Sequence, residues 1–218
     1  MDEAIKKAIE SRPSPNFQVG QYHIDAASLK RKIHKIKELL EKGDILILGE
    51  DDMASVALSS LKQYNITIID NDKRIIEAAK ANCYTPLTAI EFNIQDLYQN
   101  KFPTLAKFDL FTTDPPYSVD GMILFIAIGI KFLKIGGYGL VVNYLNKDKQ
   151  KTIDVSNAVY EFIKTNGCII ETQIPNFIYS PLSDKHCELI IIKKAQDQEL
   201  NLKSIEGPEY FYHSRKLI

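Results

Sequence analysis

Acidic and polar residues follow four predicted strands of this chain, each at the point where a strand ends. They are Gly49, Glu50, Asp51 and Asp52 after the first strand, Asp70 and Asn71 after the second, Asp96 after the third, and Asp114, Pro115, Pro116 and Tyr117 after the fourth. In open α/β sheets, ligands bind outside the carboxyl ends of the strands, where the strand order reverses. The spacing therefore predicts one carboxylate-rich site at that edge.

Taken singly, these acids also have structural interpretations. Asp51 or Asp52 can cap the helix that follows, and Asp72 can cap the next one. Asp96 can be an ordinary loop acid. Asp70 is more specific, because an acid at the end of that strand matches a ribose-hydroxyl acceptor. The four positions together are harder to explain by structure than any one of them alone.

The sharpest local signal is the run from Asp114 to Tyr117, which reads Asp-Pro-Pro-Tyr. Two prolines directly after a buried strand exclude a helix, fix the backbone and present its carbonyl groups rigidly. A purely structural turn is the alternative interpretation. We favour a binding role for this segment.

The first loop has a single glycine, Gly49, followed by three consecutive carboxylates. A nucleotide site normally has a Gly-rich loop there, whose N–H groups meet an anion. Three like charges in a cleft are unfavourable unless a cation offsets them, and they repel a phosphate or a carboxylate. A metal would need more spaced oxygen ligands, and no His or Cys lies nearby in the sequence. The loop therefore favours an organic polycation over a metal.

The elements that must position these residues alternate between strands and helices. The predicted strands span residues 45–48, 66–69, 88–93, 108–113 and 138–143. The predicted helices span residues 27–41, 53–62, 72–82, 120–133 and 151–166, and a turn at Gly136-Gly137 precedes the fifth strand. This alternation indicates βαβ units and a parallel sheet covered on both faces.

The end of the pattern differs, because residues 168–174 and 187–193 read as two strands joined by a loop without a helix. We expect a terminal hairpin whose last strand is antiparallel. Five βα units followed by such a hairpin resemble the seven-stranded Rossmann-like α/β fold of S-adenosylmethionine-dependent methyltransferases and their aminopropyltransferase relatives. We divide the chain into a helical lead-in segment (1–43), a Rossmann-like catalytic domain (44–195) and a tail (196–218).

The composition is that of an ordinary soluble globular protein, with 45% hydrophobic and 25% charged side chains among 218 residues. Its 27 Lys and Arg against 28 Asp and Glu disfavour nucleic acid as a partner. The longest apolar run, residues 122–130, is too short to cross a bilayer, and the N-terminal stretch lacks the apolar core of a signal peptide. Three cysteines without a CxxC pair indicate neither disulfides nor a thiolate zinc site. We expect a cytoplasmic protein.

Several motifs occur in a specific order. They are Arg12-Pro13-x-Pro15, Gln21, Lys42-Gly43-Asp44, Gly49-Glu50-Asp51-Asp52-Met53-Ala54-Ser55, Ile69-Asp70-Asn71-Asp72 and Phe108-Asp109-Leu110-Phe111-Thr112-Thr113-Asp114-Pro115-Pro116, followed by Gly121. Together they resemble the branched-chain polyamine synthases, also called N4-bis(aminopropyl)spermidine synthases, from about residue 11 to 137 and more loosely to 194. The chain departs from the family by having Glu50 where the motif is usually Gly-Asp-Asp-Asp. It is also too short for the family's N-terminal winged-helix-like domain.

The resemblance implies an aminopropyltransferase that uses decarboxylated S-adenosylmethionine as co-substrate and needs no metal. This donor carries an ammonium and a sulfonium but no carboxylate, and the acceptor is a polyamine such as spermidine, so an acidic loop attracts both. The attacking amine must lose a proton. Asp52 is the first choice for the group that accepts it, and Asp51 is the second.

The resemblance also places the other residues. The donor is expected to contact Gly49, Glu50, Asp70, Asn71, Asp96 and Pro115, with Asp70 at the ribose and Asp96 at the adenine amino group. The acceptor is expected to contact Asp51, Asp114, Pro116, Tyr117 and Tyr179, with Asp114 gripping the attacking nitrogen or the aminopropyl end. Tyr179 lies in a predicted loop, 175–188, that forms a wall or lid unless it is simply solvated. The aromatic tail, 207–213, is expected to dock on the domain or on a second subunit, which leaves a homodimer open.

Three other functions remain open. A methyltransferase of the N6-adenine type uses Asp-Pro-Pro-Tyr to hold an exocyclic amine, but this chain lacks a target-recognition domain and a basic stretch. A degenerate family member would only bind a nucleoside or a polyamine. A spermidine synthase of the ordinary type usually has a Gly-rich first loop, unlike this one.

Overall fold

The computed structural model describes residues 1–92, 96, 98–99, 101, 104–202 and 205–212. Its strands are β1 (Gly43–Leu48), β2 (Tyr64–Asp70), β3 (Thr88–Glu91), β4 (Phe108–Thr113), β5 (Leu133–Asn143), β6 (Cys168–Ser180) and β7 (Lys185–Lys194). Its helices are α1 (Asp2–Glu10), α2 (Ala26–Leu39), α3 (Ala54–Ser59), α4 (Lys73–Asn82), α6 (Val119–Phe132) and α7 (Gln150–Thr165), with short 3-10 helices η1 (Phe17–Val19) and η2 (Pro208–Tyr210).

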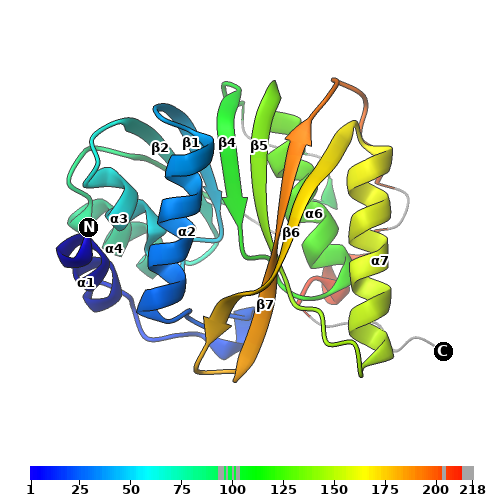
Figure 1. Ribbon diagram of the computed structural model, residues 1–218, viewed down its shortest axis with the longest axis horizontal. Helices are drawn as coiled ribbons and strands as arrows, with labels where there is room; N and C mark the ends of the chain where they lie inside the picture. Colours follow the sequence, from blue (N-terminus) through cyan, green and yellow to red (C-terminus); the bar gives the residue numbers. More distant parts are fainter. Residues whose placement is uncertain (93–95, 97, 100, 102–103, 203–204, 213–218) are drawn as a thin grey trace.

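The seven strands form one sheet in the order β3-β2-β1-β4-β5-β7-β6 (Figure 1). The first five are parallel, whereas β7 lies antiparallel between β5 and β6. The predicted Rossmann-like fold with a terminal antiparallel hairpin is confirmed. The strand order reverses between β1 and β4, which is where such folds bind ligands.

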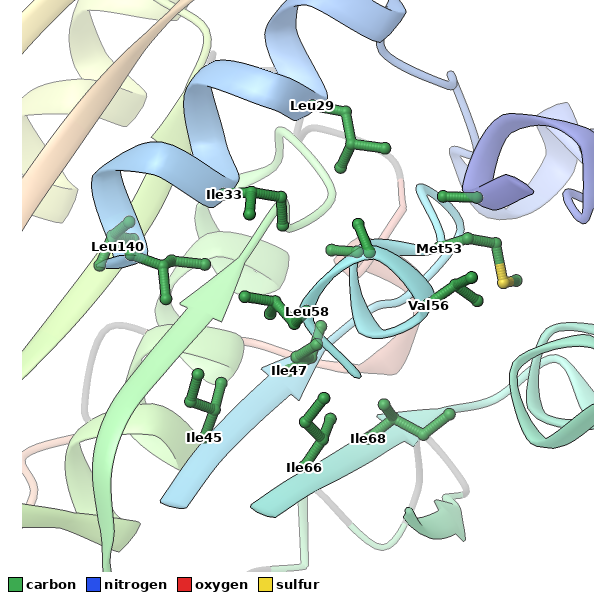
Figure 2. Packing of buried hydrophobic residues seen from close by; sticks show 14 of the residues in the cluster. Leu29, Ile33, Ile45, Ile47, Met53, Val56, Leu58, Ile66, Ile68 and Leu140 are labelled. Carbon is green, nitrogen blue, oxygen red and sulfur yellow. The ribbon is translucent and has the colours of Figure 1, made fainter. Parts of the chain in front are cut away.

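Alternation along β1 explains how the sheet is covered on both faces. Ile45 and Ile47 join a core cluster with α2, α3 and α4, while Leu46 and Leu48 join a second cluster with α6 and α7. Figure 2 shows the first cluster, where Leu29 and Ile33 of α2 lie over the strands. Because successive side chains of a strand point to opposite faces, four apolar residues in a row specify a strand buried on both sides.

The register of β1 determines which loops meet. Leu48 pairs with Ile69 of β2 on one side and with Thr113 of β4 on the other. The loops that begin at Gly49, Asp70 and Asp114 therefore leave the sheet at the same edge. Thr113 donates a hydrogen bond to the carbonyl of Leu48 (3.0 Å), which ties two of these strand ends together.

Some predicted boundaries were wrong. Helix α3 ends at Ser59, three residues earlier than predicted, and Lys62 has a positive φ of 57° that a helix excludes. Strand β5 begins at Leu133, so the predicted Gly136-Gly137 turn lies inside it, where its pairing with β4 shifts register. The third strand, predicted to extend to residue 93, ends at Glu91 in the structure, and residue 93 lies outside the described residues.

The predicted loop over residues 175–188 was also wrong, because most of it belongs to the hairpin. Strand β6 continues to Ser180 and β7 begins at Lys185, which leaves four residues in the turn. The ladder accommodates the break with a register shift between Ile174 and Ile178, where Asn176 adopts a φ of 53°. A bulge of this kind keeps a strand paired across an irregular residue.

Both ends of the described chain pack on the sheet domain. Helix α1 buries Ala4, Ile5 and Ala8, and Phe211 is fully buried against Phe125 of α6. The division into lead-in, catalytic domain and tail stays a prediction, as does a homodimer, and residues 213–218 lie outside the described residues. None of the helices in the described part is long and apolar enough to span a membrane.

Candidate active site

The first acid of the loop after β1 holds the loop in shape. One carboxylate oxygen of Glu50 accepts the N–H of Ser55 (2.5 Å), while the other is buried without a hydrogen-bond partner among the described residues. Burial raises the pKa of Glu50 to about 7, although the hydrogen bonds from Ser55 oppose the rise. The loop turns into α3 at Met53, whose left-handed conformation (φ 56°) is unusual for a residue other than glycine. Glu50 therefore positions the loop and does not line the cavities described below.

The third acid, Asp52, faces the lead-in segment. Its Oδ1 accepts the N–H of Ile24 (3.0 Å), and Lys32 Nζ lies 3.8 Å from its Oδ2. Arg12 lies 3.8 Å from Oδ1 and also donates two hydrogen bonds to the Asp52 carbonyl oxygen. Lys32 is only 2% exposed and Asp52 only 3%. Lys32 is therefore an internal counter-ion of Asp52 and helps to hold the loop that contains it.

The second acid, Asp51, and the acid after β4, Asp114, both line the two adjoining cavities at this edge. Burial, and then the charges of Asp52, Asp114 and Asp70, hold the pKa of Asp51 well above its ordinary range. Burial and the charge of Asp52 raise the pKa of Asp114 to about 6, although Lys32 opposes the rise. Asp51 and Asp114 therefore line the same cavities without enough nearby positive charge to offset their repulsion.

The acid after β2 links two loops. The carboxylate of Asp70 accepts the N–H groups of Glu50 and of Asp72, each at 2.8 Å. Burial raises its pKa to about 6, although these hydrogen bonds oppose the rise. Asp72 caps α4 by accepting the N–H of Arg74 (3.0 Å), in agreement with the structural interpretation of that residue. Asn71 donates to the hydroxyl of Tyr212 (2.6 Å), which brings the tail to this edge.

The prolines after β4 aim Tyr117 back at Asp114. The Tyr117 hydroxyl donates to Asp114 Oδ1 (3.0 Å) and lies 3.3 Å from the Cys187 sulfur. Burial, together with the charge of Asp114, holds the pKa of Tyr117 well above its ordinary range, so it remains a donor. Pro115 is buried and Pro116 is half-buried. This segment therefore places a carboxylate, a hydroxyl and an aromatic ring on one wall.

Two adjoining cavities open onto these walls. The larger has a volume of about 350 Å³ and the smaller about 40 Å³. Residues that line both are Gly20, Asp51, Asp114, Pro116 and Tyr212. The larger cavity is otherwise lined by Phe17, Gln18, Tyr22, Pro115, Tyr117 and Lys185. The smaller reaches Val19, Gln21, Gly49, Asp70, Asn71, Phe92 and Phe125.

Besides Glu50 and Asp52, two further predicted site residues lie outside both cavities. Asp96 lines neither, and its backbone carbonyl accepts the N–H of Lys101 (2.8 Å). The hydroxyl of Tyr179 donates to Asp184, and its ring stacks on that of His186 at 4.6 Å. The donor and acceptor roles assigned to these two residues stay predictions.

Other elements bring further residues to the site that the sequence did not identify as site residues. Phe17, Tyr22, Lys185 and Tyr212 line the cavities, and Lys32 neutralises part of the acid cluster. Lys185 and Tyr212 lie in segments that the sequence marks as a predicted wall and a docking tail, but only packing between distant segments brings these side chains to the cavities. No cluster of three or more His, Cys, Asp and Glu suited to a metal ion occurs in the described ranges. With its surplus of carboxylates, the site can attract and orient an organic cation.

The sequence matches one protein family and several relatives. The family described as the branched-chain polyamine synthase A C-terminal domain matches residues 1–216. An N(4)-bis(aminopropyl)spermidine synthase of Methanocaldococcus jannaschii is 30% identical over 164 residues, which cover 69% of this chain and 46% of that protein. The chain spans less than half the length of the curated relatives it matches.

Solved structures share the fold at lower sequence identity. The branched-chain polyamine synthase of Thermus thermophilus, in complex with N4-aminopropylspermidine and 5'-methylthioadenosine, aligns with a TM-score of 0.77 and 19% identity. The alignment covers 94% of this chain and 67% of that one. The N-methyltransferase NodS of Bradyrhizobium japonicum, with S-adenosyl-L-homocysteine, aligns with a TM-score of 0.59 and 14% identity over 90% of this chain and 100% of that one. These likenesses establish the methyltransferase-like fold.

Proposed function

The chain belongs to the branched-chain polyamine synthase A C-terminal domain family, and we propose that it is an aminopropyltransferase. It moves the aminopropyl group of decarboxylated S-adenosylmethionine to an amine of a polyamine such as spermidine and releases methylthioadenosine. The observation that carries this proposal is the position of Asp51 and Asp114, whose carboxylates line both cavities and have raised pKa values. Cationic donor and cationic acceptor would meet at this shared wall.

The acid cluster suits a decarboxylated donor. A donor that retained its carboxylate would bring a negative charge toward Asp51 and Asp114, whereas an ammonium and a sulfonium are attracted. Asp70 and Asn71 border the smaller cavity, consistent with the predicted ribose contact. That cavity, about 40 Å³, is far below the roughly 300 Å³ at which ligand pockets begin. Binding of the nucleoside half therefore requires the smaller cavity to widen.

The chemistry proposed is an in-line displacement. The lone pair of a neutral amine attacks the aminopropyl carbon bonded to sulfur, and the carbon–sulfur bond breaks with its electron pair going to sulfur. The attacking nitrogen becomes an ammonium, and a carboxylate accepts its proton. We assign this proton to Asp51 or Asp114, because Asp52 is engaged by Ile24 and by two cations. A pKa of about 6 for Asp114 makes it a better proton acceptor near neutral pH than an ordinary Asp.

Asp52 then has a positioning role in this proposal, although the sequence made it the first choice for the base. Its ion pairs with Arg12 and Lys32 anchor the loop that carries Asp51. Proximity supplies much of the remaining rate, because the sulfonium is already an activated leaving group.

A donor comparison tests the proposal. The purified protein is incubated with spermidine and either decarboxylated or intact S-adenosylmethionine, and the products are identified by mass spectrometry. We expect methylthioadenosine and an aminopropylated polyamine with the decarboxylated donor only. No product with that donor, together with turnover of the intact one, overturns the proposal.

One feature favours a second candidate, an N-methyltransferase. The Asp114-Pro-Pro-Tyr117 segment presents a carboxylate and an aromatic ring to the larger cavity, an arrangement suited to an exocyclic amine. Methylation of adenine-containing substrates by the intact donor in the same experiment would support it.

A further inference from the structure

A cation of the protein itself, Lys185, lines the larger cavity together with Tyr22 and Tyr117, whereas Tyr144 lines neither cavity. The ammonium of Lys185 lies 4.9 Å from the ring centroid of Tyr144, 5.4 Å from that of Tyr117 and 5.5 Å from that of Tyr22. Each distance is within the range for a cation–π interaction. Three segments far apart in the sequence thus form one aromatic cage, hereafter the tyrosine cage (Tyr22, Tyr117 and Tyr144).

Lys185 differs from Lys32 and Lys134, a buried and a half-buried lysine near the sheet. Lys32 and Lys134 each pair with a carboxylate within 4 Å, whereas in the described part of the chain no ion pair of that length joins Lys185 to a carboxylate. Its charge still reaches Asp114, where it opposes the rise in the pKa that burial causes. Lys185 is therefore held mainly by aromatic faces at the border of an acidic cavity.

The position of Lys185 in the chain is compatible with movement of its side chain out of the tyrosine cage. It is the first residue of β7 and follows the four-residue turn of the hairpin, whose Pro181, Leu182 and Asp184 are exposed. Aromatic faces attract an organic ammonium as well as they attract a lysine. A polyamine that enters the larger cavity would bring like charges close to Lys185, which is unfavourable while the lysine remains in place.

We propose that the tyrosine cage is a binding subsite for a primary ammonium group of the acceptor, and that Lys185 occupies it until the acceptor displaces the lysine. The inference rests on the proposed function for the identity of the acceptor. Asp51 and Asp114 hold the reacting part of the polyamine, and the cage holds one of its charged ends. Competition by Lys185 favours acceptors with enough charged groups to engage both places.

The test measures binding of spermidine, without donor, to the wild-type protein and to Lys185→Met by calorimetry. Removing the competing ammonium is expected to tighten binding about five- to tenfold, the size of one exposed or partly desolvated cation–π contact. Lys193→Met is the matched control, because Lys193 lies on the same strand over the Tyr138 ring, outside the cavities. It should change the Kd less than twofold. Unchanged or weaker binding by Lys185→Met overturns the proposal.

A second pair of measurements separates the cage from the reaction. Tetramethylammonium, a cation that cannot accept an aminopropyl group, is expected to bind Lys185→Met more tightly than the wild type. Adding Tyr144→Leu to Lys185→Met should weaken both tetramethylammonium and spermidine several-fold, and no loss would overturn the subsite. If both gains appear but no methylthioadenosine forms in the wild type, the proposed function fails and the cation subsite stands. If turnover is normal and neither gain appears, the subsite fails and the function stands.

Discussion

Strand β4 has an aspartate at each end, and the two have opposite surroundings. Asp109, near its start, accepts the N–H of Asp44 (2.9 Å) and pairs with Lys134 (2.8 Å). Burial favours the neutral acid there, yet these partners hold the pKa of Asp109 below its ordinary value. Asp114, after the strand, accepts one hydroxyl from Tyr117, and burial raises its pKa to about 6. One residue type on one strand thus serves two purposes.

The difference between the two ends lies in their partners. At the amino end, the fold supplies a backbone N–H and a lysine, so the carboxylate stabilises the protein in the absence of a ligand. At the carboxyl end, the fold places acids beside acids and leaves a buried oxygen of Glu50 without a hydrogen-bond partner among the described residues. Raised pKa values in a cleft are typical of functional sites. The acids at the carboxyl end therefore lower the stability of the ligand-free protein, and we expect a cationic ligand to restore it.

Stability against pH should separate the two ends most strongly. Glu50, Asp70 and Asp114 have pKa values of about 7, 6 and 6 in the folded protein, above those of the unfolded chain. The folded state therefore binds more protons, and stability falls as pH rises from about 4 through 7. His23, whose pKa is lowered by burial, contributes in the opposite sense. We expect a net loss on the order of 5 kcal/mol between pH 5 and pH 8.

Urea unfolding of the ligand-free protein at the two pH values measures this loss. Asp109, at the amino end, contributes nothing to the change in stability in that pH window, because its pKa is lowered and it titrates below pH 5. Spermidine should stabilise the protein more at pH 8 than at pH 5, since it binds the ionised acids. Greater stability of the ligand-free protein at pH 8 would contradict the interpretation.

Removing the cation that faces the acid loop should give the next largest effect. Lys32→Met leaves the buried Asp52 with Arg12 as its remaining ion-pair partner. Breaking a buried pair by deleting one partner costs about 3–5 kcal/mol. Thermal or urea unfolding checks this value. The control is Lys35→Met on the same helix, where the more exposed pair with Glu38 is worth less than about 1 kcal/mol. Equal stability of the two variants would show that Lys32 does not offset the acids.

The same substitution at each end of β4 gives the direct comparison. Asp114→Asn should reduce the rate of methylthioadenosine release about a hundredfold or more, while leaving stability unchanged or improved, because it removes a repelled carboxylate. Asp109→Asn should do the reverse, with a loss of about 1 kcal/mol and no change in kcat. Steady-state kinetics and urea unfolding on both variants measure the pattern. Equal effects on stability at both positions would end the distinction between the two ends.

The sequence predicted the sheet and the meeting of the acids after β1, β2 and β4, although not of Asp96, because both follow from local rules. The apolar run from Ile45 to Leu48 specifies a strand buried on both faces, and strand ends in a parallel sheet share an edge. The extension of β6 through Asn176 was not predicted, because Pro175-Asn176 is typical of a loop. In the structure these residues form a bulge, with a positive φ at Asn176. Such irregular pairing is decided by the partner strand rather than by the residue.

The cationic partners of the site could not be predicted in the same way. Lys32 is one of several lysines in a helix of mixed polarity, and Lys185 follows an ordinary turn. Only tertiary packing shows that the first lies under Asp52 and the second inside the tyrosine cage. Which of the loop acids accepts the proton stays a prediction, because the motif alone does not rank them. Burial and pairing distinguish Asp51 from Asp52, and neither is visible in a run of consecutive carboxylates.

The larger cavity is lined by residues from Phe17 to Tyr212, nearly the full described length of the chain. The acids of the site repel one another strongly only once folding has brought them together at the carboxyl edge of the sheet. Repulsion that arises late in folding leaves the folding rate almost unchanged and accelerates unfolding. A bound polycation would then act chiefly by slowing unfolding, so that the lifetime of the native state, and with it resistance to proteases, rises with the supply of ligand.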